Sequence, residues 1–194
     1  MTQKVAILAT IFEQFPIVIG SLLLQRHTNW DLFLVHDGPA KHRGIDNYVN
    51  FIDDPRVHYT ETEVRQQKYG HPLRREFLQN MQGRSDIDYV VITNHDNYMC
   101  PAFLDTLVSH FTPKTICTYC QHIPHNYFGW QPLQTELKLG AIDICGCMMR
   151  REAACEVGWT SNVHSADWVF LEALIKKHGK ERFKQVPGAL VVHN

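Results

Sequence analysis

The four consecutive polar residues Asn94-His95-Asp96-Asn97 directly follow a short apolar run. Their side chains could bind a metal ion or another ligand. The apolar residues 89–92 have the composition of a strand that is buried on both faces. Carboxylate and carbonyl oxygens are the ligands that hard divalent cations prefer, and Asp96 would supply such an oxygen. Asn and Asp are also the usual residues of solvated turns. The residue types alone therefore leave two interpretations, a ligand-binding tip and an ordinary turn.

The first elements of the chain predict an α/β sheet that would position this tip. Apolar runs at residues 4–9 and 31–36 flank a segment with helical spacing at residues 17–25, whose start is set by Pro16. A strand, a helix and a second strand imply a parallel pair joined by a right-handed crossover. Open sheets of this kind bind ligands beyond the carboxyl ends of their strands. Residues 94–97 would lie at such an end.

The rest of the chain continues this alternation, apart from a long irregular stretch at residues 122–139 whose aromatic side chains argue against disorder. Neither G-x-G-x-x-G after the first strand nor G-x-x-x-x-G-K-[ST] occurs, which excludes the dinucleotide fingerprint and the P-loop. The other expected elements are a partly helical excursion at 41–54, a strand at 57–60, a helix ending near Gly83, a helix opened by Pro101, strands at 115–119 and 142–149, a helix at 151–157 capped by Gly158, a helix capped by Ser165, and apolar runs at 183–186 and 190–194.

The composition is that of one soluble domain. A chain of 194 residues with 44% hydrophobic and 20% charged residues can bury one sizeable core. Its formal net charge of −1 gives no electrostatic footprint for nucleic acid or an anionic membrane. No apolar run approaches the roughly 18 residues of a membrane span, and the N-terminal run is too short for a signal peptide. We therefore expect a cytoplasmic protein without a membrane span.

The six cysteines admit a metal-binding interpretation. Cys117-Thr-Tyr-Cys120-Gln-His122 has the C-x-x-C spacing of a zinc knuckle or a redox pair, and Cys145-Gly-Cys147 could complete a set of ligands. The same residues lie in apolar runs, where cysteine is a common small buried side chain. We favour buried, reduced thiols in strands, as expected for a cytoplasmic chain.

Over nearly its whole length the chain resembles the nucleotide-sugar glycosyltransferases of the GT-A fold, family 2 in particular. Four places carry the resemblance, and their order and spacing are more specific than any one of them. They are residues 7–25 with His36-Asp37-Gly38-Pro39, which look like the first nucleotide-binding unit; Asn94-His95-Asp96 with Pro101, which sits at the Asp-x-Asp motif; Gly146-Cys-Met-Met-Arg-Arg-Glu with Gly158-Trp159, which looks like the acceptor wall; and Ala166-Asp167-Trp168, which sits at the Glu-Asp motif heading a helix.

The resemblance implies a fold and a reaction. The fold would be α/β, a single GT-A (Rossmann-like) domain over residues 1–194 with a mostly parallel central sheet flanked by helices. Residues 1–100 would form the nucleotide-sugar-binding half and residues 101–194 the acceptor-side half. The reaction would move a sugar from a nucleoside diphosphate sugar to an acceptor hydroxyl with inversion, helped by a divalent cation, Mn²⁺ or Mg²⁺, and by no organic cofactor.

The metal ligands implied are Asp96 and His193, and an imidazole ligand favours Mn²⁺ over Mg²⁺. A terminal polar residue after a strand is the alternative for His193. The sequence departs from the family pattern in two places. Asn94 replaces the first carboxylate of the metal motif, which should weaken the cation site, and in the nucleotide-binding unit Asp37 has His36 beside it in place of a second aspartate.

Asp167 is the general base implied, since a carboxylate can take the proton of the attacking hydroxyl. Its place in the first turn of a helix favours an anion, so a structural carboxylate is the alternative. The remaining candidates are Thr10, Asp37, Arg74, Arg75 and Asn94 for the nucleotide, and Trp130, Asp143 and Trp168 for the acceptor. An arginine fork suits phosphate, while a solvated surface arginine is the alternative for the pair at 74 and 75.

The partners implied are a nucleotide-sugar donor, with a UDP-sugar favoured, and a saccharide or other hydroxyl acceptor, but no nucleic acid. A partner domain or a second copy of the chain could complete the acceptor side. Three rival functions stay open: a sugar-nucleotide nucleotidyltransferase, a non-catalytic carbohydrate- or nucleotide-binding module, and a zinc-binding interaction protein. The first usually has a Gly-rich, basic loop after its first strand, and residues 9–16 contain neither glycine nor Lys or Arg.

Overall fold

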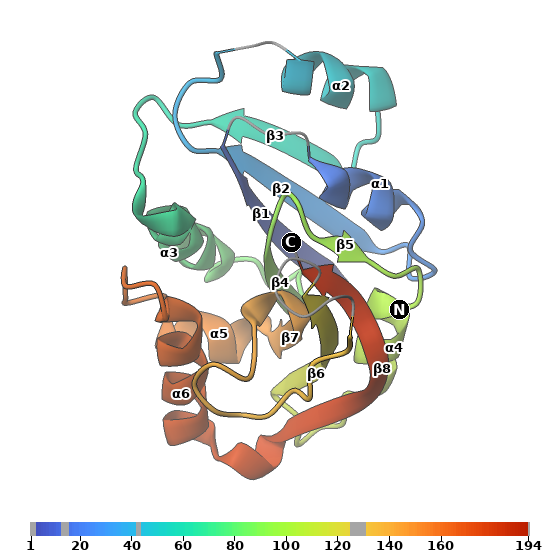
Figure 1. Cartoon of the computed structure of the whole chain (residues 1–194), viewed down its shortest axis with the longest axis vertical. Coiled ribbons are helices and arrows are strands. Elements are labelled where there is room, and N and C mark those ends of the chain that lie inside the picture. The colour runs from blue at the N-terminus through green and yellow to red at the C-terminus, as the bar shows by residue number, and fades with distance from the viewer. Residues whose placement is uncertain (1–2, 13–15, 42–43, 125–130, 194) are drawn as a thin grey trace.

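An eight-stranded sheet forms the centre of the molecule (Figure 1), with the strand order β3-β2-β1-β4-β7-β6-β8-β5. The computed structural model describes residues 3–12, 16–41, 44–124 and 131–193. The strands are β1 Val5–Ile11, β2 Trp30–His36, β3 Val57–Glu61, β4 Tyr89–Asn94, β5 Tyr98–Met99, β6 Cys117–Pro124, β7 Cys147–Arg150 and β8 Phe183–His193.

The N-terminal half of the sheet brings its polar strand ends together. Strands β3, β2, β1 and β4 are parallel neighbours, whereas β7 is antiparallel to both β4 and β6. At the carboxyl ends, Thr10 of β1 pairs with Asn94 of β4, and Ile11 pairs with His36 of β2. The expected α/β fold is confirmed, with the parallel arrangement concentrated in the half that carries these ends.

The two faces of the sheet bury separate apolar clusters, because successive side chains of a strand point to opposite faces. Ile7 belongs to one cluster and Leu8 to the other, and both are fully buried. Truncating either to alanine would cost about 2–5 kcal/mol. Helices α1 Ile17–Leu23, α2 Gly44–Ile52 and α4 Phe103–Ser109 cover the first face, and α3 His71–Met81, α5 Arg151–Val157 and α6 Ala166–His178 cover the second (Figure 1).

The strand expected at 142–149 is only half present. A short 3₁₀ turn, η2 Ile144–Gly146, precedes β7. The cause is local: Asp143 Oδ1 accepts a hydrogen bond of 2.8 Å from the backbone N–H of Cys145. A side chain that bonds the backbone two residues on favours a turn over an extended ladder.

The two apolar runs expected at the end of the chain are parts of one 11-residue strand, β8. It runs parallel to β6 and antiparallel to β5, where Tyr98 pairs with Val192. Gly188 lies in this strand at a φ of 90°, a conformation that suits glycine. The strand therefore carries His193 from the acceptor half of the chain to the edge beside β5.

Helix boundaries agree with the expectations except at two starts. Gly158 ends α5 at a φ of 67°, as expected of a glycine cap. Pro101 lies two residues before α4, and Ser165 precedes α6 without a side-chain capping bond. None of the helices in the described ranges has both the length and the apolar character needed to cross a membrane.

All six cysteines are free thiols. Cys117 and Cys120 are buried in β6, but they belong to the clusters on opposite faces of the sheet. Three positions along a strand reverse the direction of the side chain. The C-x-x-C spacing therefore does not form a chelating pair, and the interpretation as buried strand cysteines is the one that the fold supports.

Candidate functional site

Two cavities meet at the carboxyl ends of β1 and β4. The first, which we call the strand-end cavity, has a volume of about 580 Å³ and is lined among others by Thr10, Asp37, Lys68, Asn94 and Asp96. The second, the Asp167 cavity, has a volume of about 430 Å³ and is lined among others by Arg74, Asn94, Asp143, Asp167 and His193. Asn94 and Tyr69 line both. Most of the polar residues singled out from the sequence thus line one or the other of these two adjoining cavities.

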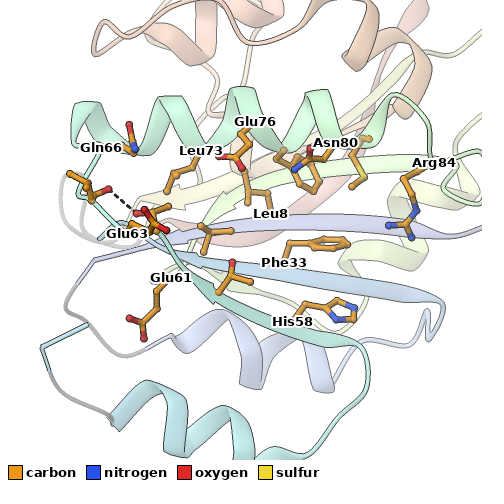
Figure 2. A pocket seen from close by; sticks show the side chains of 16 residues that line it. Leu8, Phe33, His58, Glu61, Glu63, Gln66, Leu73, Glu76, Asn80 and Arg84 are labelled. Carbon is orange, nitrogen blue, oxygen red and sulfur yellow. Dashed lines mark hydrogen bonds between the residues drawn. The ribbon is translucent and has the colours of Figure 1, made fainter. Parts of the chain in front are cut away.

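A larger cavity, of about 710 Å³, lies elsewhere, between α3 and the strands β1 to β3. Figure 2 shows Leu73 and Asn80 of α3 facing Leu8 and Phe33 of the sheet across it. Glu76, His58 and Arg84 also line it, but none of the candidate residues from the sequence that the structure describes does. We therefore locate the candidate site by its chemistry and not by its size.

Arg74 links the two cavities. Its Nη2 donates to Asn94 Oδ1 at 2.9 Å, and its Nη1 donates to Asp167 Oδ1 at 2.7 Å. Thr10 Oγ1 donates to the same Asn94 oxygen at 3.1 Å. With both bonds on Oδ1, the amide nitrogen of Asn94 remains as its donor toward a ligand. Only 4% of the Arg74 side chain is exposed, so the guanidinium is held firmly between strand β4 and helix α6.

Asp167 has the electrostatics of a general base. Burial raises its pKa and the nearby Asp143 raises it further, while Arg74 opposes the rise, with a result of about 6. Its side chain is 21% exposed and lies on the wall of its cavity. A carboxylate with this pKa is ionised at neutral pH and is a stronger base than an ordinary aspartate.

His71 and Trp159 support Arg74 from behind. His71 Nε2 lies 3.0 Å from the carbonyl oxygen of Val163, and its Nδ1 lies 3.4 Å from Arg74 Nη1. These partners fit a neutral imidazole that donates from Nε2 and accepts at Nδ1. Burial and the Arg74 charge lower the pKa of His71 to about 4. The Trp159 ring stacks on His71 at 5.4 Å between centroids, and the Arg74 guanidinium lies 4.9 Å from the centroid of the same ring.

The polar tip after β4 is a rigid element. The backbone N–H of His95 donates to the carbonyl oxygen of Thr10 at 3.1 Å, and the His95 ring Nδ1 lies 3.0 Å from the same oxygen. Val18 at the start of α1 donates its N–H to the His95 carbonyl at 2.9 Å. A solvated turn would leave these groups to water, so the bonds favour the ligand-binding interpretation of the tip.

Asp96 fits a divalent cation. Its Oδ1 is buried and has no hydrogen-bond partner within the described part of the chain. Such an orphaned carboxylate oxygen is costly unless a ligand or ion satisfies it. Asp96 also lines the strand-end cavity, where a cation could reach it. Its carboxylate is the donor type that Mn²⁺ and Mg²⁺ use.

His193 reaches the same region through β8. Its neighbour Val192 pairs with Tyr98 of β5, which lies two residues after Asp96 in the chain. The ring also approaches Asp143, with 3.3 Å between Nε2 and Oδ2. Burial opposes ionisation of Asp143, but His193 and the Cys145 N–H hold its pKa below the ordinary value.

Asp37 holds a loop. Its Oδ1 accepts the backbone N–H of Gln66 at 2.5 Å and its Oδ2 accepts that of Gln67 at 2.9 Å. In the loop that follows, Gln67, Lys68 and Tyr69 all have a positive φ, between 54° and 58°. Residues other than glycine adopt this conformation at a cost, and such strain is concentrated at functional sites.

Two candidates from the sequence, Arg75 and Trp168, lie away from the two cavities. Arg75 donates from Nε to the carbonyl oxygen of Trp159 at 2.8 Å and from Nη2 to Asn162 at 3.1 Å. Trp168 is half-buried and packs against the apolar cluster under α6. Trp130 lies outside the described residues.

Sequence reasoning missed the basic loop between β3 and α3. Arg65 and Lys68 line the strand-end cavity, and the Arg65 guanidinium lies 3.3 Å from the centroid of the Phe12 ring. Tyr69, between the two cavities, was also missed. The one signal in the sequence was Gly70, which sits at a φ of 75° against Thr10.

The chain is similar to solved structures of glycosyltransferases. It matches a mannosyltransferase, PcManGT, from Pyrobaculum calidifontis, solved with GDP-Man and Mn²⁺, at a TM-score of 0.75 and 15% identity over 98% of this chain and 56% of that one. It matches glucosyl-3-phosphoglycerate synthase from Mycobacterium tuberculosis, solved with Mn²⁺, UDP and glucosyl-3-phosphoglycerate, at a TM-score of 0.65 and 10% identity over 99% and 72% of the two chains. For GalNAc-T7, solved with UDP, GalNAc and Mn²⁺, the TM-score is 0.71 at 13% identity over 98% and 44%.

No protein-family model and no curated protein matches the sequence. The chain spans 56% of the length of the mannosyltransferase. At identities of 10% to 15%, the feature shared with these structures is the fold. The chain therefore adopts the GT-A fold, the fold that these nucleotide-sugar glycosyltransferases share.

Proposed function

We propose that this chain is the catalytic domain of a glycosyltransferase that moves a sugar from a nucleoside diphosphate sugar to an acceptor hydroxyl with inversion. The observation that carries the proposal is the shared wall of the two cavities. A carboxylate oxygen without a partner, on Asp96, lies on one side of this wall, and a base with a pKa of about 6, Asp167, lies on the other. A metal-assisted displacement needs these two groups on opposite sides of the reacting carbon.

The strand-end cavity would hold the donor, in the half formed by residues 1–100. Arg65 and Lys68 supply positive charge for the diphosphate, and Thr10 and Asn94 form the end of the sheet beneath it. We assign Asp37 an indirect part, because both its oxygens already hold the backbone of the basic loop. The fold is shared with structures that contain GDP-Man or UDP, so a nucleotide donor of either base suits this cavity.

Asp96 and His193 would hold a divalent cation, which when bound stabilises the negative charge that develops on the leaving diphosphate. The donor set of one carboxylate and one imidazole favours Mn²⁺ over Mg²⁺. The structures that share the fold contain Mn²⁺. The single carboxylate of the tip gives this chain a weaker cation site than a pair of aspartates would, because Asn94 Oδ1 already accepts two hydrogen bonds.

Asp167 would act as the base in the acceptor-side half, residues 101–194. The acceptor oxygen attacks the anomeric carbon as the bond from that carbon to the diphosphate oxygen breaks, and the hydroxyl proton passes to Asp167. A single displacement of this kind inverts the anomeric centre. Arg74 is a positioning residue, since it fixes Asp167 and Asn94 with one guanidinium. Asp143 lines the same cavity and would face the acceptor.

A thermal-shift panel tests the donor assignment. UDP-, GDP-, CMP- and dTDP-sugars would each be added with Mn²⁺, Mg²⁺ or EDTA. A ligand at about 100 times its Kd adds roughly 2.7 kcal/mol of stability, which moves Tm by several degrees for a domain of this size. We expect a shift with a UDP- or GDP-sugar that Mn²⁺ enhances and EDTA removes.

Turnover of the same donor distinguishes a transferase from a binding module. The measured quantity is release of the nucleoside diphosphate in the presence of simple saccharide acceptors. A shift without turnover in any acceptor, unchanged by Asp167→Asn, would favour the binding module. Absence of any shift with all four donors would contradict the proposal.

A further inference from the structure

A second group of metal-ligand side chains lies beside the Asp167 cavity. Asp143, Cys145 and His193 each offer one ligand atom, and these atoms all lie within 4.8 Å of one another. Within this group, His193 Nε2 and Asp143 Oδ2 are 3.3 Å apart. Ligands in a tetrahedral zinc site lie roughly 3.3–3.8 Å apart, given bond lengths of about 2.0–2.3 Å. The three atoms are therefore within about 1 Å of a tetrahedral arrangement.

His122 supplies the independent observation. Its ring is 6% exposed, and its Nδ1 is buried without a hydrogen-bond partner among the described residues. The His122 and His193 ring centroids are 6.0 Å apart, close to the roughly 5 Å expected when two imidazoles bind one tetrahedral ion. His122 also lines the Asp167 cavity, together with Asp143 and His193. An orphaned imidazole nitrogen beside three assembled ligands calls for an ion.

We propose that Asp143, Cys145, His193 and His122 form a binding site for a borderline-soft divalent cation, Zn²⁺ being the best fit. Thiolate and imidazole donors select Zn²⁺ over Mg²⁺, Ca²⁺ or Mn²⁺, which prefer oxygen. The site differs from the zinc site that the C-x-x-C spacing suggests, because Cys117 and Cys120 face opposite sides of the sheet. Its ligands come from β6, η2 with the residue before it, and β8.

Such an ion would link three elements of the chain on the acceptor side. It would tie the end of β8 to β6 and to the turn at Asp143, three elements that are otherwise joined there by strand pairing and the Asp143–His193 contact. It would also take His193 out of reach of a cation on Asp96. This last consequence rests on the proposed function: Zn²⁺ would then inhibit transfer by competing for His193.

Cobalt provides the test, because tetrahedral Co²⁺ has visible d–d bands and a thiolate ligand adds a charge-transfer band in the near ultraviolet. The full chain would be titrated with Co²⁺ under reducing conditions, without any nucleotide sugar, and then with Zn²⁺. We expect one Co²⁺ per chain, a thiolate band and displacement by one equivalent of Zn²⁺. Failure of the donor panel would leave this result unaffected, so the two proposals can fail separately.

Variants identify the ligands. Cys145→Ser should remove the thiolate band, and His122→Gln should weaken Zn²⁺ binding by more than the roughly 10- to 100-fold that loss of an outer-shell partner costs. Cys155→Ser is the matched control, because Cys155 is also buried but lies in α5, outside the cluster. Circular dichroism of each variant in EDTA checks folding. A Co²⁺ complex without a thiolate band, or unchanged Zn²⁺ affinity in His122→Gln, would overturn the proposal.

Discussion

Arg74 Nη1 lies 2.7 Å from Asp167 Oδ1, although the two residues are 93 positions apart in the chain. The pair joins helix α3 to the first turn of helix α6, and only 4% of the Arg74 side chain is exposed. The positive charge lowers the pKa of Asp167, against burial and Asp143, which raise it. The ion pair therefore sets the pH range in which the proposed base is ionised.

Replacing Arg74 with glutamine should move this range. An opposite charge at this distance lowers a carboxyl pKa by about 1–3 units, so Arg74→Gln should raise the pKa of Asp167 above 6 by a similar amount. The acid limb of the rate profile should then shift toward higher pH, and turnover at pH 7 should fall about twofold for a shift of one unit and about tenfold for a shift of two. The measurement is kcat as a function of pH between 5 and 9.

The neighbouring arginine is the matched control for that experiment. Arg75 bonds the carbonyl oxygen of Trp159 and Asn162, away from both cavities. Arg75→Gln should leave the pH midpoint of the acid limb at its value in the unmodified protein. An equal shift in both variants would mean that general loss of positive charge, and not the contact with Asp167, moves the profile.

Asp167→Asn should abolish the base. General-base catalysis contributes about 10²–10⁴-fold, so kcat should fall by that factor while donor binding in the thermal-shift panel stays the same. The unmodified chain should lose activity as the pH falls through about 6, because the raised pKa protonates Asp167 there. Glu172→Gln, on the exposed part of the same helix, is the control and should keep its activity. An Asp167→Asn protein of full activity would remove Asp167 from the mechanism.

Asn94→Asp should strengthen the cation site. Asn94 Oδ1 accepts from Thr10 and Arg74, and a carboxylate could keep both bonds while offering its second oxygen to the ion. Hard cations bind more tightly as the number of carboxylates rises. The Mn²⁺ concentration for half-maximal stabilisation by donor should fall at least about tenfold, which corresponds to 1.4 kcal/mol. Asn80→Asp, in the large cavity under α3, should leave it unchanged.

His71 should make the fold sensitive to acid. Its pKa is lowered to about 4 from an ordinary value of 6.5, so the native state favours the neutral ring. The stability that this provides is present above pH 6.5 and is lost as the pH falls toward 4. Denaturant unfolding at pH 7 and pH 4.5 should show that the original protein loses on the order of 1–3 kcal/mol more than His71→Gln. Equal losses would show that the imidazole does not titrate in this range.

Gly70→Ala should disturb the wall between the cavities. Gly70 has a φ of 75°, and a Cβ there would meet Thr10 Oγ1 at 2.9 Å. Positive φ at a residue other than glycine costs about 1–3 kcal/mol, and movement of Thr10 would loosen its bond to Asn94. We expect a lower Tm and weaker donor binding. Gly83→Ala is the control, because nothing lies within 4 Å of the added Cβ, and its Tm should not fall.

Local pattern was enough to predict most of the framework. The strand expected at 4–9 corresponds to β1, which begins at Val5, and the run 89–92 lies in β4. The parallel pairing of β1, β2 and β4 follows from the order of strands and helices. Ser165 precedes α6 without the side-chain capping bond expected of it. Asp143, in contrast, accepts a bond from the backbone and turned the start of an expected strand into η2. Whether a side chain bonds the backbone in this way depends on a single hydrogen bond, which the periodicity of apolar residues does not predict.

Within the site, the sequence by itself determined the kinds of side chain available: a polar tip with Asp96, a carboxylate at the start of α6, and two arginines at the start of α3. Only the tertiary structure decided which of them meet. Arg74 faces Asn94 and Asp167 while Arg75 faces Trp159, because consecutive residues on a helix point in different directions. The clustering of Asp143, Cys145 and His193 likewise depends on β8 returning beside β6. Contacts between residues so distant in the chain depend on how the helices pack on the sheet, and the local spacing of residues does not predict this packing.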